Sequence, residues 1–198
     1  MDGKPRRFRE RCPSKRFIFL ASGLAWTYVA TVFVIVGLCT NYWLEIRKRN
    51  LYNEDVLVHF GLRRVCWRSN SKCIDPGSSY DKQNSLDAVV GLIVTGGFLG
   101  MVASLVALAN LFLDRLGRTR VILSAAGAAA GVLSGIFLMV GVIYFSTEVE
   151  PYVEYIPVGH KKFEGYSFGL VAAAVGMMLI GGVLNGFSGF YVADPVFN

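Results

Sequence analysis

The sequence has no charged residues over more than half of its 198 positions. Four stretches contain no Asp, Glu, Lys or Arg: Phe17 to Leu44, Ala88 to Leu113, Val121 to Thr147 and Gly165 to Ala193. Each is longer than the roughly 20 residues that an α-helix needs to cross a hydrocarbon core. We therefore predict four transmembrane helices, over residues 17–44, 88–113, 121–147 and 165–193. The first stretch is too long for the apolar region of a signal peptide, so we expect it to be retained.

The same absence argues against several functions. Proton relays, secondary transporters and voltage sensors usually need ionisable side chains within the membrane. The two histidines, His59 and His160, lie outside the uncharged stretches, and no phosphate-binding loop or paired metal-ligand motif is present. We therefore expect no enzymatic activity, cofactor or metal. Within the helices the most polar side chains are Asn110 and Asn185, which we interpret as hydrogen-bonding groups between helices.

Basic residues predict the orientation of the chain. Seven lie in residues 1–16, and three more, Arg115, Arg118 and Arg120, lie in the short link at 114–120. By the positive-inside rule these segments are cytosolic, as is the tail at 194–198. The two outer loops are then residues 45–87 and 148–164. Much of the net charge of +6 lies in the basic N-terminus. This segment is beside the inner face of the membrane, where anionic lipid attracts basic residues, so we expect it to contact lipid rather than nucleic acid.

The outer loops contain patterns typical of strands. Apolar and polar residues alternate from Leu44 to Lys48 and from Val56 to Phe60, which predicts two short strands. In the second loop, residues 149–158 contain Pro151 and Pro157 and allow at best one edge strand. We therefore predict a small extracellular antiparallel sheet on an all-α membrane bundle.

Cysteine is scarce, with four residues in the chain. Cys66 and Cys73 lie in the first outer loop with six residues between them, and in an oxidising compartment we expect a disulfide. Two free thiols, or half of a zinc site with His59, are the alternatives. Cys12 lies among basic residues just before the first helix, and is either a palmitoylation site or an unmodified thiol. Cys39 is interpreted as a packing residue within the first helix.

The basic residues near the cysteines and the glycines of the third helix can each be interpreted in two ways, as a functional surface or as ordinary structure. Four basic residues flank the two cysteines: Arg63, Arg64, Arg68 and Lys72. They form either a docking or pore-lining patch or ordinary solvated surface. In the third helix, Gly127, Gly131 and Gly135 recur at four-residue spacing, which favours close approach of another helix. That helix belongs either to the same bundle or to a partner.

The residues around the cysteines resemble a known motif. Trp43, Gly61, Leu62, Cys66 and Cys73 match the outer-loop pattern of the claudin and voltage-gated calcium-channel gamma-subunit superfamily, which includes PMP22 and EMP proteins. In that pattern a Trp follows the Gly-Leu pair, whereas this chain has Arg63 there and Trp67 nearby. The resemblance implies a left-handed four-helix bundle in the plasma membrane. It also implies that Trp43 and the Gly61-Leu62 turn anchor the sheet at the outer membrane face.

Three more segments resemble the gamma-subunit branch and its AMPA-receptor relatives. They are Val121 to Ala125, Val142 to Ser146 and Gly165 to Phe168. This resemblance implies a non-enzymatic accessory subunit that binds a channel or receptor laterally. The alternative is a claudin-like adhesion protein that assembles with its own copies, in the same membrane or across a cell junction, to form a paracellular barrier or pore.

Overall fold

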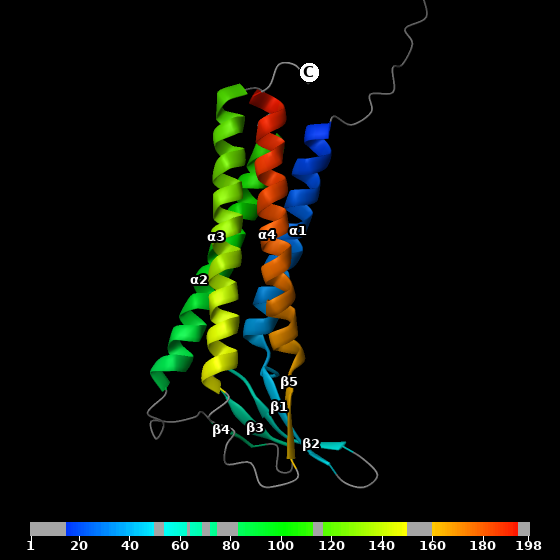
Figure 1. Ribbon diagram of the computed structural model, residues 1–198, viewed down its shortest axis with the longest axis vertical. Helices are drawn as coiled ribbons and strands as arrows, with labels where there is room; N and C mark the ends of the chain where they lie inside the picture. Colours follow the sequence, from blue (N-terminus) through cyan, green and yellow to red (C-terminus); the bar gives the residue numbers. More distant parts are fainter. Residues whose placement is uncertain are drawn as a thin grey trace, which may run out of the picture.

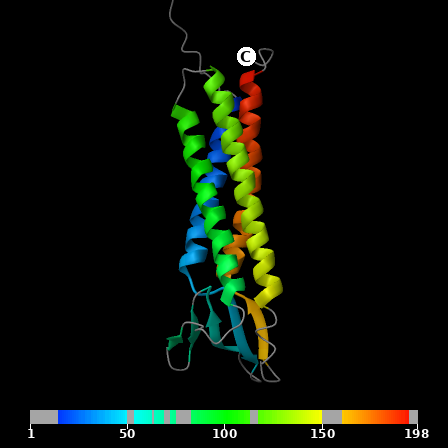
Figure 2. The ribbon, with the colours of Figure 1, turned by 90° about the vertical axis from the view of Figure 1, so that its left-hand side faces the viewer.

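The computed structural model describes residues 15–49, 54–62, 64–68, 72–74, 83–112, 117–149 and 160–193. Its main feature is an elongated bundle of four helices with a small sheet at one end (Figure 1). The helices are α1 (Lys15–Cys39), α2 (Gln83–Phe112), α3 (Gly117–Val149) and α4 (Tyr166–Ala193). A view turned by 90° shows that all four run the length of the bundle (Figure 2).

All four helices are long and apolar enough to cross a membrane. The shortest, α1, has 25 residues, or about 38 Å at 1.5 Å per residue, against a hydrocarbon core of about 30 Å. The chain is therefore a multi-pass membrane protein. α1 ends at Cys39, before the uncharged stretch ends at Leu44, because the chain turns there to begin the sheet.

Large apolar side chains cover the outside of the bundle. Leu105 is 64% exposed, Ile122 67% and Phe190 71%. In water such a surface would be unstable, but lipid tails solvate it as well as a protein core would. Because backbone groups in lipid must be paired within the segment, helices are the expected form for these spans.

Small residues allow α3 and α4 to pack closely. A Cβ atom built on Gly131 would lie 3.0 Å from the Cα atom of Gly182. The backbones of α3 and α4 therefore touch directly here, with no room for a side chain between them. A Cβ on Gly135 would meet the side chain of Leu179 on α4, while one on Gly127 would make only ordinary contact with Val106 on α2. The regularly spaced glycines of α3 thus face neighbouring helices of the same bundle.

Hydrogen bonds join the helices at the end opposite the sheet. The Asn110 side chain accepts a bond from the Arg16 guanidinium at 3.2 Å and donates one to the Ser124 hydroxyl at 2.7 Å. The Ser124 and Ser188 hydroxyls are 3.1 Å apart. This chain of contacts includes all four helices, α1 through Arg16, α2, α3 and α4. The buried amide of Asn185, by contrast, has no hydrogen-bond partner and lies against Gly23.

The sheet has five antiparallel strands in the order β4-β3-β2-β1-β5. They are β1 (Leu44–Arg49), β2 (Glu54–Phe60), β3 (Val65–Trp67), β4 (Cys73–Ile74) and β5 (His160–Glu164). The helical bundle and the small antiparallel sheet predicted from the sequence are thereby confirmed. The sequence allowed an edge strand over residues 149–158. Of these residues the structure describes only Val149. Among the described residues of that loop, a strand runs over His160–Glu164.

Two glycines of α4 provide a matched test of the packing. A Cβ on Gly182 would lie 2.9 Å from the Val132 backbone nitrogen, whereas one on Gly176 would meet nothing within 4 Å. We predict that Gly182→Ala destabilises the bundle by about 1–3 kcal/mol, because backbone cannot yield to the added methyl group. Gly176→Ala should leave the stability unchanged or slightly higher. Thermal unfolding in detergent measures both, and equal melting temperatures would contradict the packing.

A candidate binding surface where the sheet meets the helices

Trp43 lies buried at the joint between α1 and β1. Its side chain is 0% exposed. The indole N–H donates a hydrogen bond to the carbonyl of Gly37 at 2.8 Å, and the backbone N–H donates to the carbonyl of Phe60 at 2.8 Å. The first bond satisfies a carbonyl in the last turn of α1, which has no partner within the helix. The second begins the pairing of β1 with β2.

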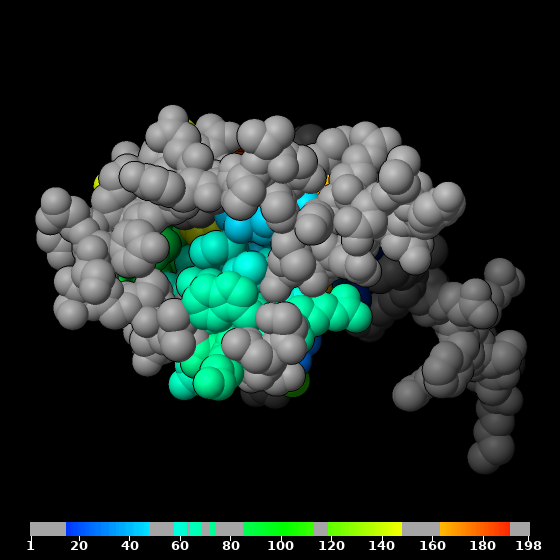
Figure 3. Space-filling view, turned by 90° about the horizontal axis from the view of Figure 1, so that it is seen from below, coloured from blue at the N-terminus to red at the C-terminus, as the bar shows by residue number. Residues whose placement is uncertain are grey.

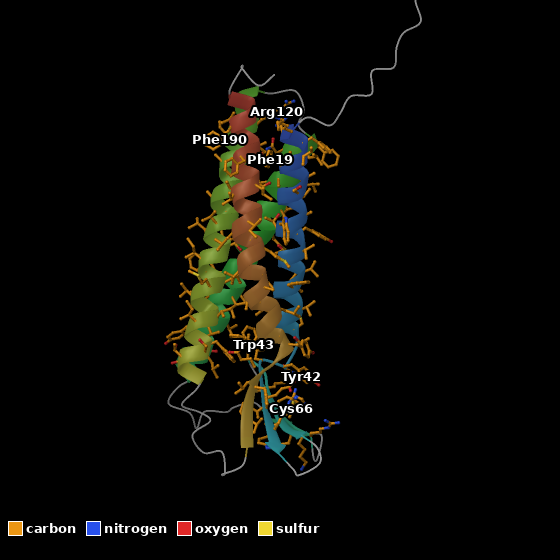
Figure 4. The ribbon with its side chains drawn as sticks, turned by 45° about the vertical axis from the view of Figure 1, so that its right-hand side comes forward. Phe19, Tyr42, Trp43, Cys66, Arg120 and Phe190 are labelled. Atoms are coloured by element: carbon orange, nitrogen blue, oxygen red, sulfur yellow. A yellow bond between two sulfur atoms is a disulfide. The ribbon has the colours of Figure 1, made fainter. Side chains whose placement is uncertain are left out.

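Two aromatic rings connect Trp43 to the other helices. The ring centroid of Trp43 is 4.9 Å from that of Phe145 on α3 and 6.3 Å from that of Phe168 on α4. Phe145 and Phe168 are themselves 5.9 Å apart. Aromatic pairs at such distances stabilise by about 0.5–1.5 kcal/mol beyond the burial of their area. The base of the sheet is thus packed onto three helices (Figure 4).

Two glycines allow the chain to pass close to this joint. A Cβ on Gly61 would lie 2.9 Å from the Cα atom of Asn41, and one on Gly165 would clash with the Tyr42 carbonyl. Gly165 also separates β5 from α4, and its N–H donates to the carbonyl of Trp43 at 3.0 Å. The Ser167 N–H donates to the carbonyl of Tyr42 at 3.0 Å. Through these contacts β5 and the start of α4 are attached to the start of β1.

A partly exposed group of three rings lies on the side of the joint, where Tyr42 stacks on Tyr166 and meets His59 edge-on. Tyr42 is centred between Tyr166, at 4.8 Å, and His59, at 4.3 Å. Tyr166 is 51% exposed. Tyrosines are typical of the boundary between membrane and water. The stack therefore marks the level at which the helices leave the lipid.

Charged side chains surround His59 on the sheet. Arg47 donates two hydrogen bonds to Glu45 at 2.8 and 3.2 Å and stacks over the ring of Phe163. The Nδ1 atom of His59 lies 3.9 Å from a Glu45 oxygen and has no hydrogen-bond partner. Burial lowers the pKa of His59 below its ordinary value of 6.5. Glu45 acts in the opposite direction, while Arg68 and Arg47 add to the lowering.

The predicted disulfide between Cys66 and Cys73 is confirmed. It joins β3 to β4, in which the two cysteines are paired opposite one another. Trp67 follows in β3, half-buried and opposite Val58. The disulfide thus fixes the far edge of the sheet, where β4 contributes only two residues.

Arg64, Arg68 and Lys72 lie exposed around this disulfide. Seen from below, the sheet end of the molecule shows described residues of the first loop near its centre (Figure 3). Arg63 and Cys12 lie outside the described residues. Sequence reasoning assigned no role of its own to Tyr42 or Phe145, and it did not find the strand at His160–Glu164. The aromatic residues could have been found as the large rings nearest to the ends of the uncharged stretches.

Among the described residues no group of three His, Cys, Asp or Glu side chains could hold a metal ion. The surface is suited to recognition by aromatic and charged groups. Residues 16–185 match the model of the PMP-22/EMP/MP20/Claudin family. The chain belongs to this family, whose members are generally not enzymes. No curated protein matches the sequence.

Two tryptophans of the same segment test the role of Trp43. Trp43→Phe leaves the Gly37 carbonyl without its partner, and we predict a loss of about 1–3 kcal/mol of unfolding free energy. Trp43→Ala should cost about 3–5 kcal/mol because it also leaves a cavity. Trp26, which is 40% exposed on α1, provides the control, and Trp26→Phe should be nearly neutral. A melting temperature lowered equally by the two Trp→Phe variants would refute this account.

His59 should make the sheet sensitive to acid. Its pKa is lower in the folded protein than in the unfolded chain, so the unfolded chain binds the proton more readily. The contribution of His59 to stability is therefore fully present above pH 6.5 and falls as the pH drops through 6.5 towards the folded pKa. We predict that the melting temperature falls more between about pH 8 and about pH 5 in the wild type than in His59→Gln. Parallel pH profiles for the two proteins would contradict this prediction.

Proposed function

We propose that this protein is a non-enzymatic accessory subunit of an ion channel or receptor. The observation that carries the proposal is the continuity of sheet and helices at Trp43 and Gly165. Only residues 40–43 separate α1 from β1, and only Gly165 separates β5 from α4. Backbone hydrogen bonds from Gly165 and Ser167 bind these two connections to each other.

Such a joint couples events outside the membrane to events within it. A partner that contacts the sheet moves β1 and β5, and these strands continue into α1 and α4 with no free linker. The same subunit can therefore sense the extracellular part of a channel and contact its helices. To change gating it must contact the open and closed states with different free energies.

The outside of the bundle offers the second contact. Exposed apolar side chains such as Ile122 and Ile143 on α3 and Ile180 on α4 cover its surface. In the bilayer, a channel helix replaces lipid at such a face through close packing rather than through the hydrophobic effect. Lateral binding of this kind requires no charged group in the membrane, in agreement with the sequence.

We further propose a location in the plasma membrane, with the sheet outside the cell and both termini in the cytosol. The disulfide supports this orientation, since it is stable in an oxidising compartment. Lys15, Arg16 and Arg120 lie at the opposite end of the bundle from the sheet, as the positive-inside rule requires (Figure 4).

A second candidate function is claudin-like adhesion, in which copies of the chain assemble at a cell junction. The observation that favours it is that Arg64, Arg68 and Lys72 are all exposed on the part of the first loop that carries the disulfide. Lining a paracellular path, these side chains would favour anions. Under this alternative, reversing the charge of Arg64 and Arg68 changes the ion preference of the junction.

The first experiment is purification of the tagged chain from native membranes in mild detergent, with identification of stoichiometric partners by mass spectrometry. We predict recovery of a channel or receptor pore subunit. In recordings of that channel, Cys66→Ala should abolish the modulation, because loss of the disulfide releases β4 from β3. The chain-entropy estimate for closing this short loop is about 2.4 kcal/mol.

Cys39→Ala serves as the matched control, since Cys39 is an exposed free thiol. This variant should modulate the channel as the wild type does. Full modulation by Cys66→Ala would exclude a role for the sheet. Recovery of only further copies of this chain with junction proteins would replace the accessory function by adhesion.

A further inference from the structure

A groove of about 450 Å³ opens between α1 and α2 at the sheet end of the bundle. Its lining includes Leu38 and Cys39 at the end of α1 and Val90 and Val94 on α2. On the side towards the sheet it is lined by Asn41, Leu62 and Arg64. The volume lies within the range of about 300–1,000 Å³ that is usual for sites of small ligands. The groove lies against the buried cluster around Trp43, to which Leu62 belongs and on which Leu38 and Val90 pack.

The groove arises because α1 and α2 are close at mid-bundle and part towards the sheet. A Cβ on Gly97 would lie 3.0 Å from the Cγ1 atom of Val34, so the two helices touch there. Nearer to the sheet, Leu38 and Cys39 on α1 and Val90 and Val94 on α2 line open space between the two helices. In Figure 1 the sheet end of α2 lies well away from that of α1. The space between them is the groove.

The chemistry of the groove changes along the membrane normal. Val90 and Val94 are one helical turn apart and give the deep part an apolar wall, in which Val94 is 50% exposed. Asn41 and Arg64 give the mouth an amide and a guanidinium. This mouth lies where the chain leaves α1, next to Tyr42 and Trp43, at the level where lipid headgroups begin.

We propose that the groove binds a phospholipid of the sheet-side leaflet, with an acyl chain between α1 and α2 and its phosphate at Arg64. Charge complementarity carries this choice. The occupant must be apolar along Val90 and Val94 and anionic at Arg64, and a phospholipid combines both. A guanidinium matches the geometry of a phosphate with paired hydrogen bonds. The site depends neither on the proposed channel partner nor on the orientation of the chain.

A lipid in this position also completes the packing of the bundle. Where α1 and α2 separate, an acyl chain replaces the side chains that would otherwise fill the space. Because a ligand that binds only the folded protein stabilises it, phospholipid should protect the wild type against unfolding. The same protection should be smaller in a variant whose groove is filled.

Native mass spectrometry of the full chain in mild detergent tests the headgroup. The probes are a phosphatidylcholine and the diacylglycerol with the same acyl chains, which lacks the phosphate. We expect wild-type protein to retain phosphatidylcholine in preference to diacylglycerol. Arg64→Gln should lower the binding of phosphatidylcholine about fivefold, the factor expected for one basic residue near a lipid surface. Arg68→Gln, which removes an exposed arginine outside the groove, should leave it unchanged.

A second pair of variants tests the groove itself. Val94→Trp fills the space between the helices and should reduce phosphatidylcholine binding, whereas Leu105→Trp, at another lipid-facing position of α2, should not. Both positions are exposed, so both variants are expected to fold, and gel filtration checks this. In a Cys12→Ser background, added phosphatidylcholine should slow the reaction of Cys39 with an apolar maleimide, because Cys39 lines the groove.

Several results would overturn the proposal. Equal binding of phosphatidylcholine and diacylglycerol would remove the role of the phosphate. If Arg64→Gln and Arg68→Gln lowered phosphatidylcholine binding equally, the binding would depend on the overall basic charge of the loop and not on a site at Arg64. Unchanged binding in Val94→Trp, or unchanged reactivity of Cys39, would place the lipid elsewhere.

Discussion

The burial of Trp43 satisfies three requirements of the structure at one point. Its indole N–H satisfies a carbonyl at the end of α1, its backbone N–H begins the pairing of β1 with β2, and its ring packs against Phe145 and Phe168. The sheet has five short strands, and packing against the helices stabilises it. This packing is possible because β1 begins and β2 ends next to Trp43, which belongs to the core of the bundle.

The helices themselves associate by two different means along their length. Through the middle, small residues let backbones touch, as at Gly131 and Gly182. At the end opposite the sheet, Asn110, Ser124 and Ser188 form a chain of hydrogen bonds. Lipid tails are as apolar as the side chains of the helices. The hydrophobic effect therefore does not drive helix association in either of these two regions. The groove opens where α1 and α2 separate near the sheet.

Much of the architecture could be predicted from the sequence for simple reasons. Absence of charge over four long stretches requires helices that span a membrane, and two cysteines in one outer loop indicated the disulfide. The strand at His160–Glu164 could not be predicted, because three of its five residues are basic or histidine and it has no clear apolar alternation. It forms because the edge of β1 offers unpaired backbone groups. The groove at Val94 could not be predicted either, since it depends on the angle between two helices. The same holds for the stack of Tyr42 and Tyr166, whose members are far apart in the chain.

The two ends of the strand order have a consequence for how copies of this protein can meet. An exposed edge strand is normally a template for pairing with another chain, and lysines on such a strand oppose that pairing. Here one edge, β4, has two residues and is held by a disulfide, while the other, β5, carries Lys161 and Lys162 in sequence. Both edges are thus protected against strand-to-strand polymerisation. Two copies in apposed membranes would therefore remain separate molecules that touch through faces and loops, and could part again without unfolding.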